Sequence, residues 1–130
     1  MTDLLDAMPL AEVLGIKLVD AQADEVTLRL EFSERLCTTG GVLHGGVLMS
    51  LADTAGAICA FLNLPPGAGT GTIESKTNFL RAVRDGHVDA VARPLHIGRS
   101  TIVVQTELRD AAGRRAGITL QTQAVLEARA

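Results

Sequence analysis

Hydrophobic and polar side chains alternate along several stretches of the chain, and this alternation predicts β-strands. In EVTLRLEF, residues 25–32, every second residue is apolar (Val26, Leu28, Leu30 and Phe32) and the residues between them are polar. Such a strand would bury one face and expose the other. The same reasoning predicts four further strands, at residues 70–83, 87–94, 99–109 and 115–128.

Turn-forming residues separate these strands. Asp85-Gly86 predicts a hairpin between the second and third strands, and the DAAG segment at 110–113 predicts another turn. Apolar residues also share one face in each of the last two strands. They are Ile102, Val104 and Leu108 in the strand at 99–109, and Ile118, Leu120 and Leu126 in the strand at 115–128.

Two segments without this alternation predict helices. Residues 9–15 predict a short helix, with Pro9 in its first turn and Gly15 as its C-cap. Residues 45–62 form a long apolar run, and Asn63 and the following Pro-Pro-Gly predict its end. At about 100° per residue, the large aliphatic face comprises Leu48, Leu51, Ala55, Ile58 and Leu62. The opposite face, around Asp53, comprises Gly46, Met49, Ser50, Gly56, Ala57 and Ala60.

These elements predict an α+β fold in one domain, residues 1–130. Five or six antiparallel strands would form a single sheet, and one long helix would accompany it. Because the helix is apolar over most of its circumference, we expect the sheet to wrap around it.

Composition excludes several classes of function. The net charge of −3 and the small number of aromatic residues disfavour a nucleic-acid surface. The N-terminus lacks the basic region of a signal peptide, and the longest apolar run, interrupted by Asp53, is a poor membrane span. The two cysteines and three histidines lack metal-ligand spacing, and Cys59 is expected in the core. We therefore expect a cytoplasmic protein without a metal site.

Asp53 is the first candidate for chemistry, because it is a carboxylate in the middle of an apolar helix. Carboxylates whose environment is perturbed in this way are candidates for functional sites. A structural alternative is that Asp53 accepts hydrogen bonds from Ser50 or Thr54 and tolerates partial burial. The sequence leaves both alternatives open.

The second candidate is the segment His44-Gly45-Gly46, at the predicted start of the same helix. A helix N-terminus presents unpaired N–H groups and a partial positive charge, which suit an oxyanion. Glycines at 45 and 46 remove side chains that would block a carbonyl oxygen. A structural alternative is that the glycines only form a turn and that His44 caps the helix.

The spacing of the two candidates predicts an active site shared between two chains. Gly45 and Asp53 are eight residues apart, which is about 12 Å along a helix. This distance is too long for both to act on one carbonyl carbon. A second, antiparallel copy of the helix in a two-fold dimer would bring Gly45 of one chain to Asp53 of the other.

The motif Gly41-Val42-Leu43-His44-Gly45-Gly46, followed by Asp53, resembles the hotdog-fold acyl-CoA thioesterases. The similarity is greatest to the group that contains the phenylacetate-pathway and 4-hydroxybenzoyl-CoA thioesterases. It continues through NFLRAVRDG at 78–86 and HIGRST at 96–101, and so covers nearly the whole chain after Glu25.

The resemblance implies a long helix wrapped by an antiparallel sheet, in homodimers that often pair into tetramers. It implies a hydrolase that cleaves acyl-CoA, with an aromatic or medium-chain acyl group among the options, and without a cofactor. The Gly45 N–H would polarise the thioester carbonyl, and the partner's Asp53 would act as nucleophile or general base. The other residues that it implicates are His44, Thr72 and Thr38 in catalysis, and Gly46, Met49, Ala57, Arg81, Arg99, Ser100 and Thr101 in binding of the substrate and its coenzyme A.

Thr38 departs from the pattern, because relatives usually carry Asn or Gln six residues before the His. A Thr hydroxyl lacks the reach of an Asn or Gln amide. The sequence therefore leaves open whether this position orients the water or contacts the carbonyl. Two alternatives to hydrolysis also stay open: a hydratase or dehydratase of acyl-CoA, and a protein that only binds acyl-CoA.

Overall fold

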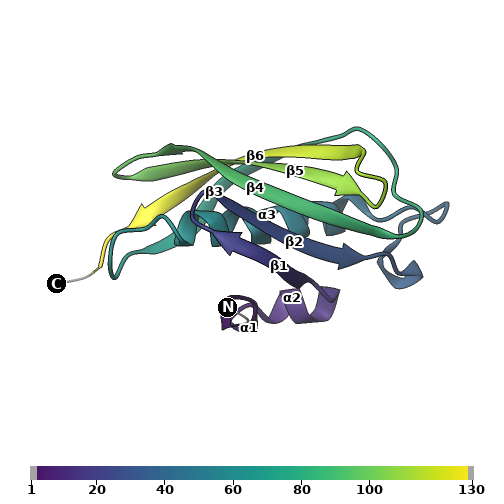
Figure 1. Ribbon diagram of the computed structural model, residues 1–130, viewed down its shortest axis with the longest axis horizontal. Helices are drawn as coiled ribbons and strands as arrows, with labels where there is room; N and C mark the ends of the chain where they lie inside the picture. The colour runs from purple at the N-terminus through teal and green to yellow at the C-terminus, as the bar shows by residue number, and fades with distance from the viewer. Residues whose placement is uncertain (1–2, 129–130) are drawn as a thin grey trace.

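The computed structural model describes residues 3–128, and it confirms the predicted arrangement of one long helix against one antiparallel sheet (Figure 1). The helices are α1 (Asp3–Asp6), α2 (Pro9–Leu14) and α3 (Gly45–Phe61), with a 3-10 turn, η1, at Glu34–Leu36. The strands are β1 (Lys17–Gln22), β2 (Glu25–Glu31), β3 (Gly69–Phe79), β4 (His87–Ile97), β5 (Thr101–Asp110) and β6 (Arg115–Leu126).

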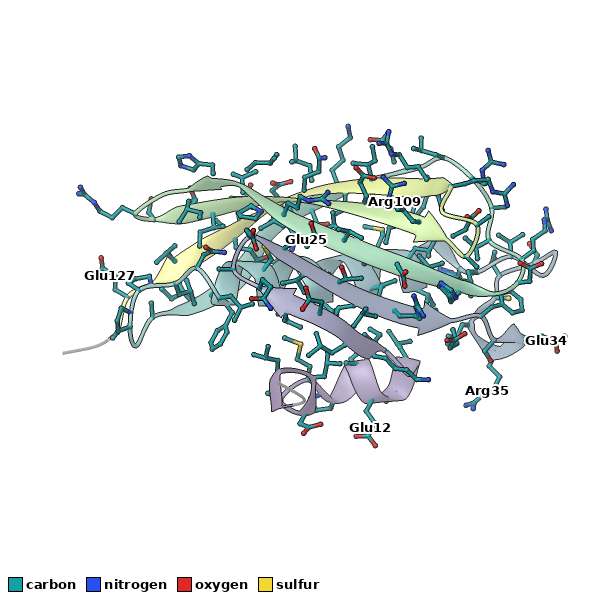
Figure 2. All side chains as sticks on the ribbon, in the orientation of Figure 1. Glu12, Glu25, Glu34, Arg35, Arg109 and Glu127 are labelled. Atoms are coloured by element: carbon teal, nitrogen blue, oxygen red, sulfur yellow. The ribbon has the colours of Figure 1, made fainter. Side chains whose placement is uncertain are left out.

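The six strands form one sheet in the order β1-β2-β4-β5-β6-β3, and all neighbours are antiparallel. The sheet curves over α3, while α1 and α2 lie beside β1 (Figure 1). Glu12 of α2 points away from the sheet (Figure 2). The order leaves β1 and β3 as the two edge strands, and no other described strand pairs with the outer side of β3.

The long helix α3 follows the prediction closely, because it begins at Gly45 and ends at Phe61, one residue before the predicted end. Its large aliphatic side faces the sheet: Leu48, Leu51, Ala55 and Ile58 are buried. Complete burial of a Leu or Ile side chain stabilises a fold by roughly 1.5–3 kcal/mol. In the described residues, 3–128, no helix combines the length and the apolar character that crossing a membrane requires.

The apolar faces of β2 and β5 also pack against α3 as predicted. Val26, Leu28 and Leu30 of β2 are fully buried, as are Ile102, Val104 and Leu108 of β5. The alternate side chains, among them Arg109, project from the outer face of the sheet (Figure 2).

Strand β6 presents its polar side to the helix. Thr119, Gln121 and Gln123 are fully buried, whereas Leu120 and Leu126 are 43% and 55% exposed. Ile118, Leu120 and Leu126 do lie on one side of the strand, but that side is the outer one. The alternation predicts two faces correctly without showing which face the core takes.

Several boundaries differ from the prediction. The strand expected at 70–83 ends at Phe79, where the N–H groups of Leu80 and Arg81 both turn to the Ala116 carbonyl. Strand β4 continues past Pro94 to Ile97. A proline is tolerated there because β2 pairs with β4 only as far as Ala92, and because the β4–β5 register shifts just after Pro94.

The N-terminal part contains one predicted helix and two elements that were not singled out. Helix α2 ends as predicted at Gly15, whose φ of 72° is the left-handed conformation that favours glycine at a C-cap. Helix α1 and strand β1 are additional. In β1 only Ala21 is buried, and a register shift lies between Leu18 and Asp20, so the strand has no clear alternation.

Candidate active site

The start of α3 is organised by the side chain of His44. His44 Nδ1 accepts a hydrogen bond from the Gly46 N–H at 2.8 Å, and the His44 N–H donates to the Leu36 carbonyl at 2.9 Å. A Cβ at position 46 would lie 3.0 Å from Nδ1, so glycine allows the close approach. With Nδ1 accepting, the hydrogen of the neutral ring is on Nε2.

The N–H of Gly45 is the free donor at this helix end. It has no hydrogen-bond partner among the described residues, whereas the neighbouring Gly46 N–H is occupied by His44. It lies beside a groove of about 440 Å³ whose lining includes Leu48, Phe79 and Arg81. The helix dipole adds a partial positive charge at this point, so the groove can hold a carbonyl oxygen that gains negative charge.

Asp53 lies two turns further along α3, in a smaller pocket of about 200 Å³. Its Oδ1 is 2.7 Å from the Thr72 hydroxyl and accepts a hydrogen bond from Gln121 Nε2 at 3.0 Å. The alternative partners suggested by the sequence are occupied elsewhere. Ser50 Oγ donates to the Gly46 carbonyl and Thr54 Oγ1 donates to the Ser50 carbonyl, so Asp53 is bound by the sheet.

A β-bulge in β3 shapes the Asp53 pocket. The β3–β6 register shifts between Thr72 and Glu74, which leaves Ile73 as an extra residue. Thr72 and Ser75 therefore both line the pocket, although side chains three residues apart in a regular strand point to opposite faces. The Ser75 hydroxyl is buried and has no partner among the described residues.

Gly45 and Asp53 do not meet within one chain. Both lie on α3, and their separation along the helix is roughly 12 Å. The groove at Gly45 and the pocket at Asp53 have no lining residue in common. One chain therefore presents two separate halves of the predicted site.

The predicted coenzyme A residues are also divided between two ends of the sheet. Arg81 lines the Gly45 groove. Arg99 and Ser100 are exposed in the β4–β5 turn, where the Val125 N–H donates to the Ser100 carbonyl. Since Val125 pairs with Thr70, this turn lies at the opposite end of β3 from Phe79.

The remaining predicted residues lie close to one of the two halves. Met49 lines the Asp53 pocket, and Ala57 follows it on the same side of α3. Thr38 is exposed in the loop before α3, where its N–H donates to the Val42 carbonyl. Thr101 begins β5, and its carbonyl accepts the Gly98 N–H.

The cysteines do not provide an alternative nucleophile. Cys59 is fully buried, as expected, and burial together with the nearby Asp24 carboxylate raises the pKa of its thiol to about 11. Cys37 is half-buried and lies against the Ser33 carbonyl. Within residues 3–128, no group of three or more His, Cys, Asp or Glu side chains could hold a metal ion.

The sequence interpretation missed Gln121, Gln123, Phe79 and Ser75. Thr119, Gln121 and Gln123 recur at the spacing of one strand face, which is a polar row in a strand whose other face is apolar. That row was the available signal, because a polar row facing the core of a small domain is typical of functional sites. Phe79 and Ser75 gave no comparable signal.

Comparison with known proteins identifies related chains. Residues 40–116 match the family model described as Thioesterase superfamily. The chain is 35% identical over 120 residues to the putative esterase ComA2 of Bacillus subtilis, covering 91% of this chain and 94% of the relative. It is 34% identical over 103 residues to 1,4-dihydroxy-2-naphthoyl-CoA hydrolase of Listeria monocytogenes, covering 79% and 84%. A thioesterase structure from Haemophilus influenzae superposes with a TM-score of 0.87 at 30% identity, covering 91% of this chain and 82% of the other.

Proposed function

The chain belongs to the thioesterase superfamily and is a thioester hydrolase with the hotdog fold, and from this premise we propose that it hydrolyses acyl-CoA at a site built by two subunits. In this site the Gly45 N–H of one subunit binds the thioester carbonyl oxygen, and Asp53 of the partner subunit acts on the carbonyl carbon. The products are free coenzyme A and a carboxylic acid. The observation that carries the proposal is the separation of these two groups on one helix.

The open edge of β3 supports this arrangement. An 11-residue edge strand with one unpaired side is a ready template for a second strand. Gly45 packs against the Phe79 ring, and Asp53 accepts from Thr72. A two-fold axis near Ser75 and Lys76 would pair β3 with its copy and place Phe79 beside Thr72 of the partner subunit. Gly45 and the partner's Asp53 would then face one cavity.

The same pairing would unite the divided coenzyme A residues. Arg81 follows Phe79 at one end of β3, and Arg99 lies beyond its other end, roughly 35 Å away at the rise of a strand. Antiparallel pairing would bring Arg81 to the end of the sheet that carries Arg99 of the partner subunit. Two guanidinium groups at one mouth suit the phosphates of coenzyme A, and the adjacent Ser100 and Thr101 offer hydroxyls to the pantetheine arm.

In the reaction, electron density moves from the carbonyl carbon–oxygen double bond to the oxygen as the tetrahedral intermediate forms. The Gly45 N–H and the α3 dipole stabilise that charge, which is typically worth about 10²–10³ in rate for one donor. Asp53 either attacks the carbon itself, forming an anhydride that a water molecule cleaves after coenzyme A has left, or removes a proton from the attacking water. The carbon–sulfur bond then breaks, and His44, with Nε2–H free, assists the departing thiolate of coenzyme A.

The substrate is an acyl-CoA whose acyl group lies near Met49 and Ala57. The Listeria relative is named for an aromatic acyl-CoA, which supports testing aromatic acyl groups first. Thr38 stands where relatives usually carry an Asn or Gln amide, so the contact that this position makes near the thioester carbonyl should differ from theirs. The tetrameric assembly and the cytoplasmic location stay predictions.

Three variants test the proposal by release of free thiol from benzoyl-, phenylacetyl- and octanoyl-CoA. Asp53→Asn is expected to lower kcat by at least about a hundredfold. Gly45→Pro removes the free N–H and adds the proline ring, and His44 already has the extended backbone (ψ 135°) that precedes proline. Its matched control, Gly45→Ala, adds the same Cβ near Phe79 but keeps the N–H, and should retain most activity. Full activity of Asp53→Asn, or equal activity of the two Gly45 variants, would contradict the proposal.

A further inference from the structure

Two glutamine side chains are buried side by side beneath α3. Gln121 and Gln123 of β6 are both fully buried, on the side of the strand that faces the helix. Burying an amide costs a few kcal/mol unless hydrogen bonds replace those made with water. An apolar pair at these positions would pack against the helix without that cost, so the glutamines need another explanation.

The hydrogen bonds of this pair lead toward Asp53. Gln121 Nε2 donates to Asp53 Oδ1 at 3.0 Å and to Gln123 Oε1 at 2.8 Å. Gln123 Nε2 in turn donates to Thr70 Oγ1 at 3.1 Å, and that hydroxyl donates to the Ala124 carbonyl. The amide next to the carboxylate is thus held by a chain of contacts that ends on the backbone.

The orientation of the Gln121 amide follows from its surroundings. Rotating it by half a turn would direct Oε1 at two other acceptors, Asp53 Oδ1 and Gln123 Oε1. Both hydrogens of Nε2 would then be unused. In the observed orientation Nε2 uses both hydrogens, whereas Gln121 Oε1 is buried without a partner. The side chain leaves one acceptor unpaired and keeps its donor on Asp53.

Gly56 provides the space that the amide occupies. A Cβ at position 56 would lie 2.2 Å from Gln121 Oε1 and 2.8 Å from Nε2. Gly56 is a buried residue of α3, one helical turn beyond Asp53. Glycine in a helix interior costs roughly 0.5–1 kcal/mol relative to alanine, so the helix gives up stability where the Gln121 amide approaches.

We propose that Gln121, seated against Gly56, is the positioning residue for the Asp53 carboxylate. It fixes Oδ1, so that Oδ2, which has no hydrogen bond to a described residue, points to the substrate. This inference rests on the proposed function, in which Asp53 acts on the thioester. Gln121 itself is fully buried. It acts on the substrate through Asp53 and makes no direct contact with it.

A double-mutant cycle between positions 56 and 121 tests the inference with acyl-CoA turnover. Gln121→Ala should lower kcat about tenfold or more and change KM less than about twofold, because the hydrogen bond to a charged group is lost. Gly56→Ala should lower kcat similarly, because the added methyl displaces the amide. In Gln121→Ala, the same Gly56→Ala change should cost no further activity, since the methyl enters vacated space.

The matched control is Thr106→Val. Thr106 is another fully buried polar residue on the inner side of the sheet, and its hydroxyl has no partner among the described residues. This variant should keep kcat within about twofold of wild type and lose no thermal stability, because the shape is retained and an unpaired hydroxyl is removed.

The outcomes separate this inference from the proposed function. If wild type hydrolyses acyl-CoA, Asp53→Asn is inactive and Gln121→Ala keeps wild-type kcat, the positioning role is wrong and the proposed function stands. The positioning role is also wrong if the decreases in kcat caused by Gly56→Ala and by Gln121→Ala multiply in the double variant. If Asp53→Asn is fully active, the proposed function itself fails.

Discussion

At the scale of single residues, the candidate site is a carboxylate and two neighbours, and these three residues come from three elements. Asp53 is on α3, Thr72 is on β3 and Gln121 is on β6. Both neighbours contact the same oxygen, Oδ1. The site is therefore assembled by tertiary packing, and no local segment of the sequence contains it.

Thr72 is the neighbour closest to solvent, and its hydroxyl makes the first prediction at this scale. Its Oγ1 lies 2.7 Å from Asp53 Oδ1 and 2.6 Å from Gln123 Oε1, yet it has one hydrogen to donate. Thr72→Val should lower kcat roughly tenfold, since one hydrogen bond to a charged acceptor is lost without a change in shape.

Thr72→Ser is the matched control, because it keeps the hydroxyl and loses only a methyl group. It should hydrolyse acyl-CoA at close to the wild-type rate in the same thiol-release assay. Equal rates for the Val and Ser variants would show that the Thr72 hydroxyl has no part in catalysis.

The residue scale also shows what the sequence could predict of the site. Asp53 and His44-Gly45-Gly46 stand out locally, because a lone carboxylate in an apolar helix and a glycine pair at its start are each unusual. Gln121 could not be connected with Asp53, since 68 residues separate them and only the packing of α3 against β6 brings them together.

At the scale of elements, the turn between β5 and β6 holds an ion pair that should make stability depend on pH. Burial of the Asp110 carboxyl raises its pKa, but the N–H groups of Arg114 and Ala112 and the Arg114 guanidinium lower it more. The net result is a pKa below the ordinary value of 3.8. The folded state therefore binds this proton less readily than the unfolded state.

This difference predicts the behaviour of Asp110→Asn in urea unfolding. Above the ordinary pKa the charged carboxylate stabilises the fold, so wild type should be more stable than the variant at neutral pH. The advantage should shrink as the pH falls through the pKa of folded Asp110. Asp85→Asn, in the exposed turn before β4, is the control for the substitution itself and should change stability at neutral pH less than Asp110→Asn does. If the difference in free energy of unfolding between wild type and Asp110→Asn stays constant at acidic pH, the ion pair of Asp110 is not its source.

The elements also differ in how far the sequence determined them. Strands β2 and β5 were predicted with the correct buried face, because only one of their faces is apolar. In β6 the inner face is polar, since it adjoins Asp53, and the alternation of side chains cannot show this. Strand β1 gave no signal, because a register shift interrupts it and only Ala21 is buried.

At the scale of the whole molecule, the residues of the proposed site lie in two groups, toward the two ends of one strand. Gly45 and Arg81 lie near Phe79, whereas Asp53 and Arg99 lie toward the start of β3. One two-fold axis that pairs β3 with its copy would bring Gly45 to the partner's Asp53 and Arg81 toward the partner's Arg99. The same pairing would cover the open edge of the sheet. The dimer is thus part of the proposed mechanism.

Complementation between two inactive variants shows whether two subunits share one active site. Chains carrying Gly45→Pro and chains carrying Asp53→Asn are given different affinity tags and co-expressed, and the mixed dimer is isolated through both tags. One of its sites combines both substitutions, while the other combines an intact Gly45 with an intact Asp53 from the opposite chain. We predict that each parent is inactive and that the mixed dimer regains about half of the wild-type activity per dimer, as two independent sites require. A verified mixed dimer that remains inactive, or a wild-type monomer that is fully active, would contradict the account.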